Sequence, residues 1–185
     1  MGLRRITLDM WIRQLIHELQ KPVKDWKASY RDWSDPALFQ KWLRLILDYS
    51  RRYDMGEGFG LSPVSKNFGL LTFRFLKFFT NLGQELYYNP ALTSVPGLSN
   101  IWHERKIVNF FIKNETLEID LAYALQYIGY SLSNSDLEAL FAARETKSNT
   151  SKRLPASHYY DHDSIEIVKK RENFIIELFG YNVPE

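Results

Sequence analysis

Residues 161–180, DHDSIEIVKKRENFIIELFG, constrain the fold most, because they form the pattern of a long amphipathic helix. Its apolar residues recur every three or four positions, at Ile165, Val168, Ile175, Leu178 and Phe179. Asp163 and Glu166 have the spacing of a capping box, and Gly180 suits the residue that ends a helix. Since one face is apolar, we expect this helix to be fixed by burial in a core.

Five further helices are predicted from the same kind of pattern. Two come early: residues 8–20 place Leu8, Trp11, Leu15, Ile16 and Leu19 on one face, and a helix at Pro36 is capped by Ser34 or Asp35. Residues 68–83 are apolar on nearly all sides and predict a short buried helix. Residues 116–129 end at Gly129, and residues 133–145 open with Ser135 and Glu138 as a second capping box.

One segment, KIVNFFIKNE at 106–115, predicts a strand. Its β-prone residues Ile107, Val108, Phe110, Phe111 and Ile112 form an almost continuous run, as in a strand covered on both faces. The turn-rich residues 87–100 predict a long surface loop, and Gly56, Gly58 and Gly60 predict a mobile one. The expected fold is therefore α/β but mainly helical, with one buried strand and about six helices.

Composition narrows the classes of function. A chain of 185 residues with 45% hydrophobic residues is expected to form a single domain with a sizeable core. Its net charge of +2 gives no field for nonspecific nucleic-acid binding, so any anion site must be local. Without cysteine there is no disulfide, thiolate metal site or cysteine nucleophile. No apolar run suits a signal peptide or membrane span, so we expect a soluble, cytoplasmic protein.

Residues 147–153, KSNTSKR, combine hydroxyl groups, an amide and three cations, which are the donors that bind phosphate or sulfate. A solvated connector is the competing interpretation. His103 and Glu115 are weak catalytic candidates, because Glu115 lies at the end of the predicted strand and His103 precedes it. Capping of the following helix by Glu115 or Thr116 is the competing interpretation. A metal site at His158, Asp161 and His162 competes with the simpler interpretation of surface histidines.

Several segments together resemble the carboxyl-terminal half of a sulfotransferase family protein. They are FGLLTFRFLKFF, ERKIVNFFIKNETLEIDLAYALQYIGYSLS, KSNTSKR and HYYDHDSIEIVKKRENFIIELFGY, and they span roughly residues 60 to 183. The matching positions are Glu115, Thr116, Leu117, Gly129, Asn149, Ser151, Arg153, Tyr160, Asp161, Phe179, Gly180 and Tyr181. The region from 60 to 184 would then be sulfotransferase-like, after a helical amino-terminal segment 1–55.

This resemblance implies transfer of a sulfuryl group from 3′-phosphoadenosine 5′-phosphosulfate (PAPS) to a hydroxyl or amine acceptor such as a carbohydrate. It also implies that the donor's phosphate contacts Lys147, Asn149, Ser151, Lys152 and Arg153. The family's two donor motifs, Lys/Arg-Gly-Thr-Thr/Ser and Arg-x-Pro-x-x-Arg-x-x-Ser, do not occur in this sequence. We therefore expect a chain that lacks the donor-binding half and is weakly active or inactive alone.

A non-enzymatic function is the alternative. The chain would be a helical interaction protein that binds a partner subunit or its own copy through aromatic residues including Trp26, Trp33 and Trp102. Neither interpretation involves nucleic acid or a membrane. A metal-dependent hydrolase built on the two histidines near Asp161 is a third interpretation.

Overall fold

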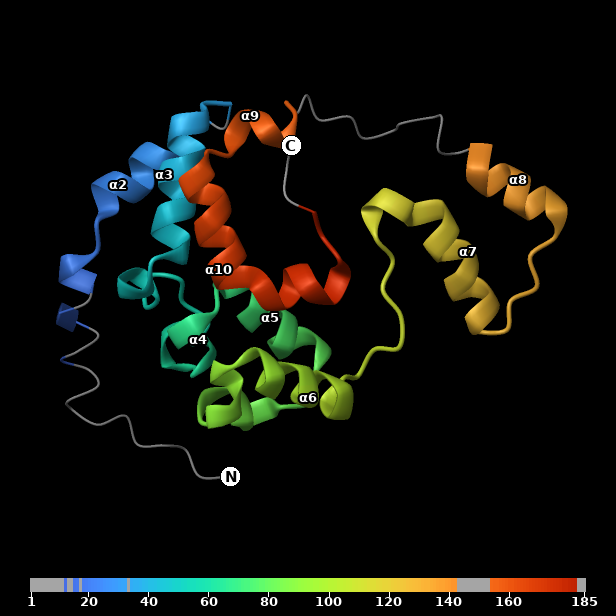
Figure 1. Cartoon of the computed structure of the whole chain (residues 1–185), viewed down its shortest axis with the longest axis horizontal. Helices are drawn as coiled ribbons and strands as arrows, with labels where there is room; N and C mark the ends of the chain where they lie inside the picture. The colour runs from blue at the N-terminus through green and yellow to red at the C-terminus, as the bar shows by residue number, and fades with distance from the viewer. Residues whose placement is uncertain (1–11, 13–14, 17, 33, 143–153, 183–185) are drawn as a thin grey trace. The chain divides into compact units, whose positions relative to one another are not determined.

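The computed structural model describes residues 12, 15–16, 18–32, 34–142 and 154–182, so the predicted helix at 8–20 is described only in part and Trp33 lies outside. The chain forms two compact units, Met1–Lys106 with Leu154–Glu185 (unit 1) and Ile107–Arg153 (unit 2). Every regular element in the described ranges is helical, and the β pairing there is a single antiparallel bridge between Thr80 and Lys106 (Figure 1). The fold is mainly helical, as expected, but the predicted α/β class is wrong.

The predicted buried strand is absent: residues 107–113, which make up most of it, have no regular secondary structure. Ile107 is 59% exposed, and Phe110 and Ile112 are exposed too, so the run is not covered on both faces. A strand needs a neighbour to pair its backbone N–H and C=O groups. Pairing in the described chain stops at Lys106, just before the apolar run. The high β-propensity of these residues was not enough to form a strand, because no partner strand in the described chain pairs with them.

In unit 1, helix α3 (Pro36–Leu47) packs against α2 (Val23–Ser29), α9 (Ala156–Tyr159) and α10 (His162–Phe179). The Asp35 side chain accepts a hydrogen bond from the Ala37 amide, and Pro36 lies in the first turn, which confirms the predicted start of α3. The Phe39 ring lies 5.1 Å from that of Tyr160 and so joins α3 to the chain that enters α10.

The predicted buried helix is confirmed as α5 (Leu70–Phe79), and its Phe75 is the centre of an aromatic core. The ring of Phe75 lies 4.8 Å from Trp102 of α6 (Val95–Arg105) and 5.6 Å from Phe179 of α10. Short 3-10 helices connect the longer elements between α3 and α6, at Tyr49–Arg51, Phe59–Leu61, Gly83–Tyr87 and Pro90–Thr93.

The prediction of a long surface loop at residues 87–100 is therefore wrong, because helices occupy most of this segment. Ser94 caps α6 by accepting from the Gly97 amide, and a proline lies in the first turn of that helix. Pro96, one of the residues that make this segment turn-rich, thus belongs to the start of a helix. Leu92 and Leu98 are fully buried there, so this segment contributes to the core.

Both predicted capping boxes form two residues earlier than expected. At α10 the Asp161 side chain accepts from the Ser164 amide, and the Ser164 hydroxyl accepts from the Asp161 amide. At α8 (Asn134–Ala142), Ser133 and Asp136 exchange the equivalent bonds. Short Asp and Ser side chains reach the amides of the first turn directly, so they cap these helices in place of the predicted pairs. The predicted stop at Gly180 is confirmed by its left-handed φ of 64°.

Helix α10 is kinked at Glu172, whose φ of −121° and ψ of 20° are not helical. The Glu172 carboxylate accepts hydrogen bonds from the Leu71 amide (3.1 Å), the Thr72 amide (2.9 Å) and the Thr72 hydroxyl (2.6 Å). It thereby caps the first turn of α5 from a distant part of the chain. The Gly69 amide donates to the Arg171 carbonyl at 2.7 Å. We call Arg171, Glu172, Gly69 and Thr72 the kink clamp.

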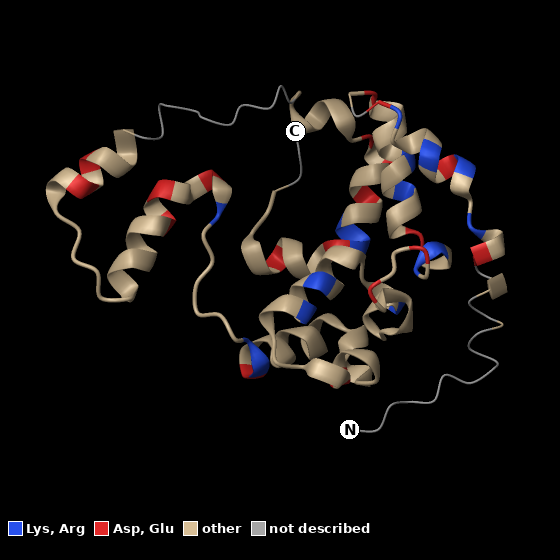
Figure 2. Cartoon of the chain, turned by 180° about the vertical axis from the view of Figure 1, so that it is seen from behind, with Lys and Arg blue, Asp and Glu red and all other residues tan. Residues whose placement is uncertain are grey.

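Unit 2 contains the 3-10 helix Asn114–Thr116, α7 (Leu117–Tyr127) and α8. Asp120 accepts from the Lys113 amide and the Thr116 hydroxyl and so fixes the start of α7. Gly129, with φ of 86°, follows the end of α7 as predicted. Among residues 107–142 only Ala122 is buried. Helices α7 and α8 carry acidic residues and no Lys or Arg (Figure 2).

Gly69→Ala is expected to destabilise the protein. A Cβ at Gly69 would lie 2.0 Å from Glu172 Oε1, so the buried carboxylate would have to leave the amides that it caps. We expect a loss of about 1–3 kcal/mol in the free energy of unfolding, measured by urea denaturation. In a Glu172→Ala background the same substitution should cost much less. An equal cost in both backgrounds would contradict the clamp.

Candidate functional site

The predicted donor-binding residues Lys147, Asn149, Ser151, Lys152 and Arg153 lie outside the described residues. The two weak catalytic candidates are described and belong to different units. His103 is exposed in the last turn of α6, and Glu115 is exposed in the 3-10 helix before α7. Neither lines the pockets described below.

The structure gives Asp161 a structural role. Its carboxylate caps α10 and also accepts from Arg44 at 2.6 Å, and these bonds lower its pKa, chiefly those with Ser164. Within the described ranges no three His, Asp or Glu side chains gather in a way that could hold a metal ion. His158 and His162 flank this cap on α9 and at the first position of α10.

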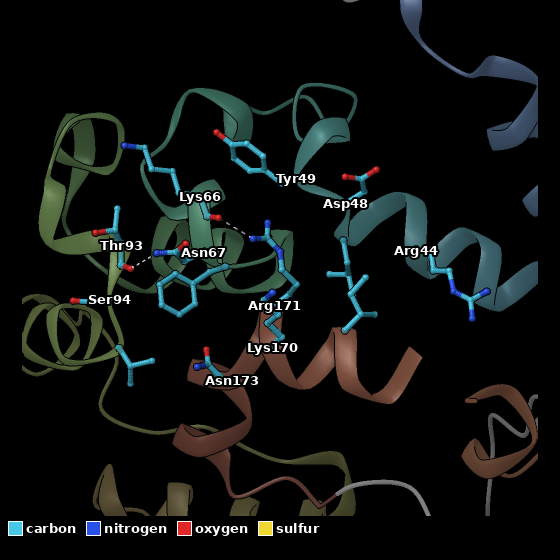
Figure 3. Close-up of a pocket in the computed structure, with 14 residues that line it drawn as sticks. Arg44, Asp48, Tyr49, Lys66, Asn67, Thr93, Ser94, Lys170, Arg171 and Asn173 are labelled. Atoms are coloured by element: carbon cyan, nitrogen blue, oxygen red, sulfur yellow. Dashed lines mark hydrogen bonds between the residues drawn. The ribbon is translucent and has the colours of Figure 1, made fainter. Parts of the chain in front are cut away.

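The candidate site is a pocket of about 860 Å³ beside the kink of α10 (Figure 3). Its walls come from the end of α3, from α4 (Val64–Asn67), from the junction of the Pro90–Thr93 helix with α6, and from α10. The Asn67 side chain donates to the Thr93 carbonyl at 2.8 Å and joins two of these walls. The polar lining residues are Arg44, Asp48, Tyr49, Lys66, Asn67, Thr93, Ser94, Lys170, Arg171 and Asn173.

The pocket is cationic. Its lining has four basic side chains, Arg44, Lys66, Lys170 and Arg171, against the one carboxylate of Asp48. Asp48 already accepts from the Ser50 amide and hydroxyl, each at 2.8 Å. Arg44 is paired with Asp161, whereas neither Lys66 nor Lys170 has a carboxylate partner among the described residues. Two uncompensated ammonium groups therefore border the pocket.

Arg171 is the buried cation of the site, with 7% of its surface exposed. Its two terminal nitrogens donate to the Ser65 carbonyl at 2.9 Å and the Lys66 carbonyl at 3.1 Å. Its Nε is buried and has no hydrogen-bond partner in the described part of the chain. Burial lowers the pKa of Arg171, and the charge of Glu172 opposes that shift. The guanidinium stays protonated at neutral pH, so the pocket has a fixed positive charge at its base.

Glu172 lies beside Arg171 in sequence, but its side chain bonds to α5 and does not line the pocket. Burial raises the pKa of its carboxyl group, and the bonds from Thr72 and Leu71 oppose the shift. No ion pair joins the two side chains in the described structure, because Arg171 donates to backbone carbonyls of α4 and Glu172 accepts from backbone amides of α5. Glu172 therefore forms no ion pair with Arg171, although its charge acts on the guanidinium.

Sequence reasoning missed this site, although a signal was present. The apolar positions of the last helix are 165, 168, 175, 178 and 179, and the repeat of three to four residues predicts another core position at 171 or 172. Arg171 and Glu172 occupy that core position. Charged residues in a core position need partners, so such a pair indicates a built polar site.

No protein-family model, no curated protein and no solved structure matches this chain. The sulfotransferase resemblance therefore stays a prediction. Among the helices described, none is long and apolar enough to cross a membrane.

The buried Glu172 predicts an unusual pH dependence. Since burial raises its pKa in the folded state, the folded protein holds this proton more tightly than the unfolded chain, whose Glu pKa is about 4.3. Glu172 therefore favours folding more as the pH falls through its raised pKa. The unfolding free energy of the wild type minus that of Glu172→Gln should rise as the pH is lowered toward about 4.3, the value of the unfolded chain, measured by urea denaturation. A difference independent of pH would contradict the assignment.

Proposed function

We propose that this chain binds a small molecule carrying a phosphate or sulfate group in the pocket at the kink of α10. The observation that carries the proposal is the set of basic side chains that line the pocket, with Arg171 buried in its wall beside Lys66 and Lys170. A guanidinium held by two backbone carbonyls is pre-oriented, so binding costs little side-chain entropy. Tetrahedral oxyanions accept several charge-assisted hydrogen bonds, which suits this set of donors.

The size of the pocket favours a ligand larger than an inorganic ion. About 860 Å³ is within the range of sites for small molecules and cofactors. The ring of Tyr49 and the side chains of Leu47, Phe68, Val95 and Ile167 line the same space. The anionic group would lie at Arg171 and the lysines, and an organic part would contact these apolar residues.

The expected sulfate donor PAPS is one ligand of this class, and its product 3′-phosphoadenosine 5′-phosphate is a practical probe. Sulfuryl transfer to a hydroxyl or amine acceptor stays a prediction of the resemblance, as does the cytoplasmic location. We propose binding alone and not sulfuryl transfer, because the described ranges lack the strand and sheet that the resemblance implied.

Calorimetric titration with 3′-phosphoadenosine 5′-phosphate and with inorganic phosphate tests the proposal. Lys66→Ala and Lys170→Ala should each weaken binding by about three- to tenfold, because each removes an ammonium group worth up to about 1.4 kcal/mol. Lys169→Ala is the matched control, since Lys169 pairs with Glu166 and does not line the pocket. Affinity should fall as salt rises. No detectable binding at millimolar ligand, or an equal loss of affinity in all three variants, would overturn the site.

Self-association is a second candidate function, favoured by the exposed apolar residues of unit 2. Between residues 107 and 142 the exposed large apolar side chains are Ile107, Phe110, Ile112, Leu117, Ile119, Tyr123, Tyr127, Ile128, Tyr130 and Phe141. A helix pair with one buried residue has little core of its own. We propose that a second copy of the chain covers this apolar surface.

Sedimentation velocity over a range of protein concentrations tests this second candidate. The wild type should shift from monomer to dimer, and Ile128→Lys should weaken the dimer by at least about tenfold, because Ile128 is 75% exposed and would place a charge in the interface. Leu61→Lys is the matched control, as Leu61 is 58% exposed in unit 1. A monomer at every concentration would rule out self-association.

A further inference from the structure

Helix α2 has one face held in unit 1 and another that is open to solvent. The helix packs against α3, and the indole nitrogen of Trp26 donates to Asp54 Oδ2 at 3.1 Å. Trp26 also lines a second pocket, of about 450 Å³. The solvent-facing residues lie within about 120° of one another around the helix. They are Val23, Lys24, Lys27 and Tyr30, and we call them the basic face.

The basic face combines apolar surface with unpaired positive charge. Val23 is 47% exposed and Tyr30 is 69% exposed. Neither lysine of the face has a carboxylate partner in the described ranges. The acidic residue of α2, Asp25, is already paired with Lys41 of α3 at 2.7 Å, so it does not neutralise them. Both lysines are therefore available to a partner.

Exposed apolar side chains also precede the basic face along the chain. The described residues of the predicted helix at 8–20 are helical, but the predicted apolar face is not covered. Its exposed members are Ile12, Leu15, Ile16 and Leu19. Contiguous exposed apolar surface beside charged residues is typical of a site of protein association. The amino-terminal part of unit 1 thus lacks a partner for its apolar side chains.

Helix α7 in unit 2 has an exposed face of the opposite charge. Ile119, Tyr123 and Tyr127 follow one another at intervals of four residues, so they form one exposed stripe along the helix. Glu115 precedes this stripe by four residues, and Glu118 adjoins its first member. Neither glutamate has a cationic partner in the part of the chain that is described. We call these five residues the acidic face.

The two faces complement each other in charge and in length. Lys24 and Lys27 are three residues apart, and Glu115 and Glu118 have the same spacing, so two ion pairs can form at once. At about 1.5 Å per residue, the basic face and the stripe of α7 each extend over roughly 10–12 Å. Tyrosine rings also attract ammonium groups, and the acidic face carries two of them. Helices α7 and α8 have no Lys or Arg that would compete for the carboxylates.

We propose that the basic face of one copy of the chain packs against the acidic face of a second copy. This inference rests on the self-association proposed above, and it names the surface that covers α7 in the dimer. The contact joins unlike surfaces, and a symmetric pair of copies forms it twice. Val23 and Tyr30 would pack on the apolar stripe, and the lysines would pair with the glutamates.

Sedimentation velocity of charge-reversal variants of the 185-residue chain tests this contact. Lys24→Glu with Lys27→Glu should weaken the dimer by at least about tenfold, because like charges then face each other. Glu115→Lys with Glu118→Lys should have a similar effect. The matched control is Lys106→Glu with Lys169→Glu, which makes the same change in net charge at exposed positions of unit 1 outside α2. Circular dichroism shows whether the helices of each variant remain.

Mixing the two reversed variants gives the sharpest result. In a mixed dimer the reversed α2 of one copy meets the reversed α7 of the other, and the two unchanged faces meet as well. Equal amounts of the two variants should therefore restore a dimer that neither forms alone. A lysine variant that dimerises like the wild type, while Ile128→Lys still weakens the dimer, would overturn this inference and leave self-association through unit 2 standing.

Two further outcomes would count against the contact. A wild type that stays monomeric at every concentration would overturn both this inference and the self-association on which it rests. Flotation of a monomeric wild type with phosphatidylserine vesicles, lost in Lys24→Glu with Lys27→Glu, would assign the basic face to anionic lipid instead of a second copy.

Discussion

The kink clamp is the interaction on which unit 1 depends. One residue pair in the last helix serves both ends of the segment between α4 and α5: Arg171 donates to carbonyls of α4, and Glu172 accepts from the first amides of α5. Helix ends leave unpaired backbone groups that are costly to bury. The Ser65 carbonyl and the Thr72 amide are such groups, and side chains about 100 residues away in sequence satisfy them through buried hydrogen bonds. The clamp therefore couples formation of α10 to the packing of α4 and α5.

The clamp also explains why a charged pocket can exist beside a hydrophobic core. Two backbone carbonyls accept from the terminal nitrogens of Arg171, and the charges of Glu172 and Asp48 offset part of the cost of burying its guanidinium. No carboxylate in the described chain forms an ion pair with it. Because the adjacent Glu172 is engaged by α5 instead, Arg171 keeps its positive charge where Lys66 and Lys170 border the pocket. Because the helix is kinked at Glu172, the Arg171 side chain can bond to α4 while the Glu172 side chain bonds to α5.

Local patterns in the sequence predicted helices well and long-range pairing poorly. Asp35 and Pro36, Gly129 and Gly180 mark helix ends through backbone geometry that depends on the residue itself, so these boundaries could be predicted. The strand at 107–112 could not be judged from its own residues, because a strand exists only with a partner. The Arg171 site needed contacts between residues 65 and 171, which no local pattern specifies. Only the charged pair in a core position of the last helix indicated it.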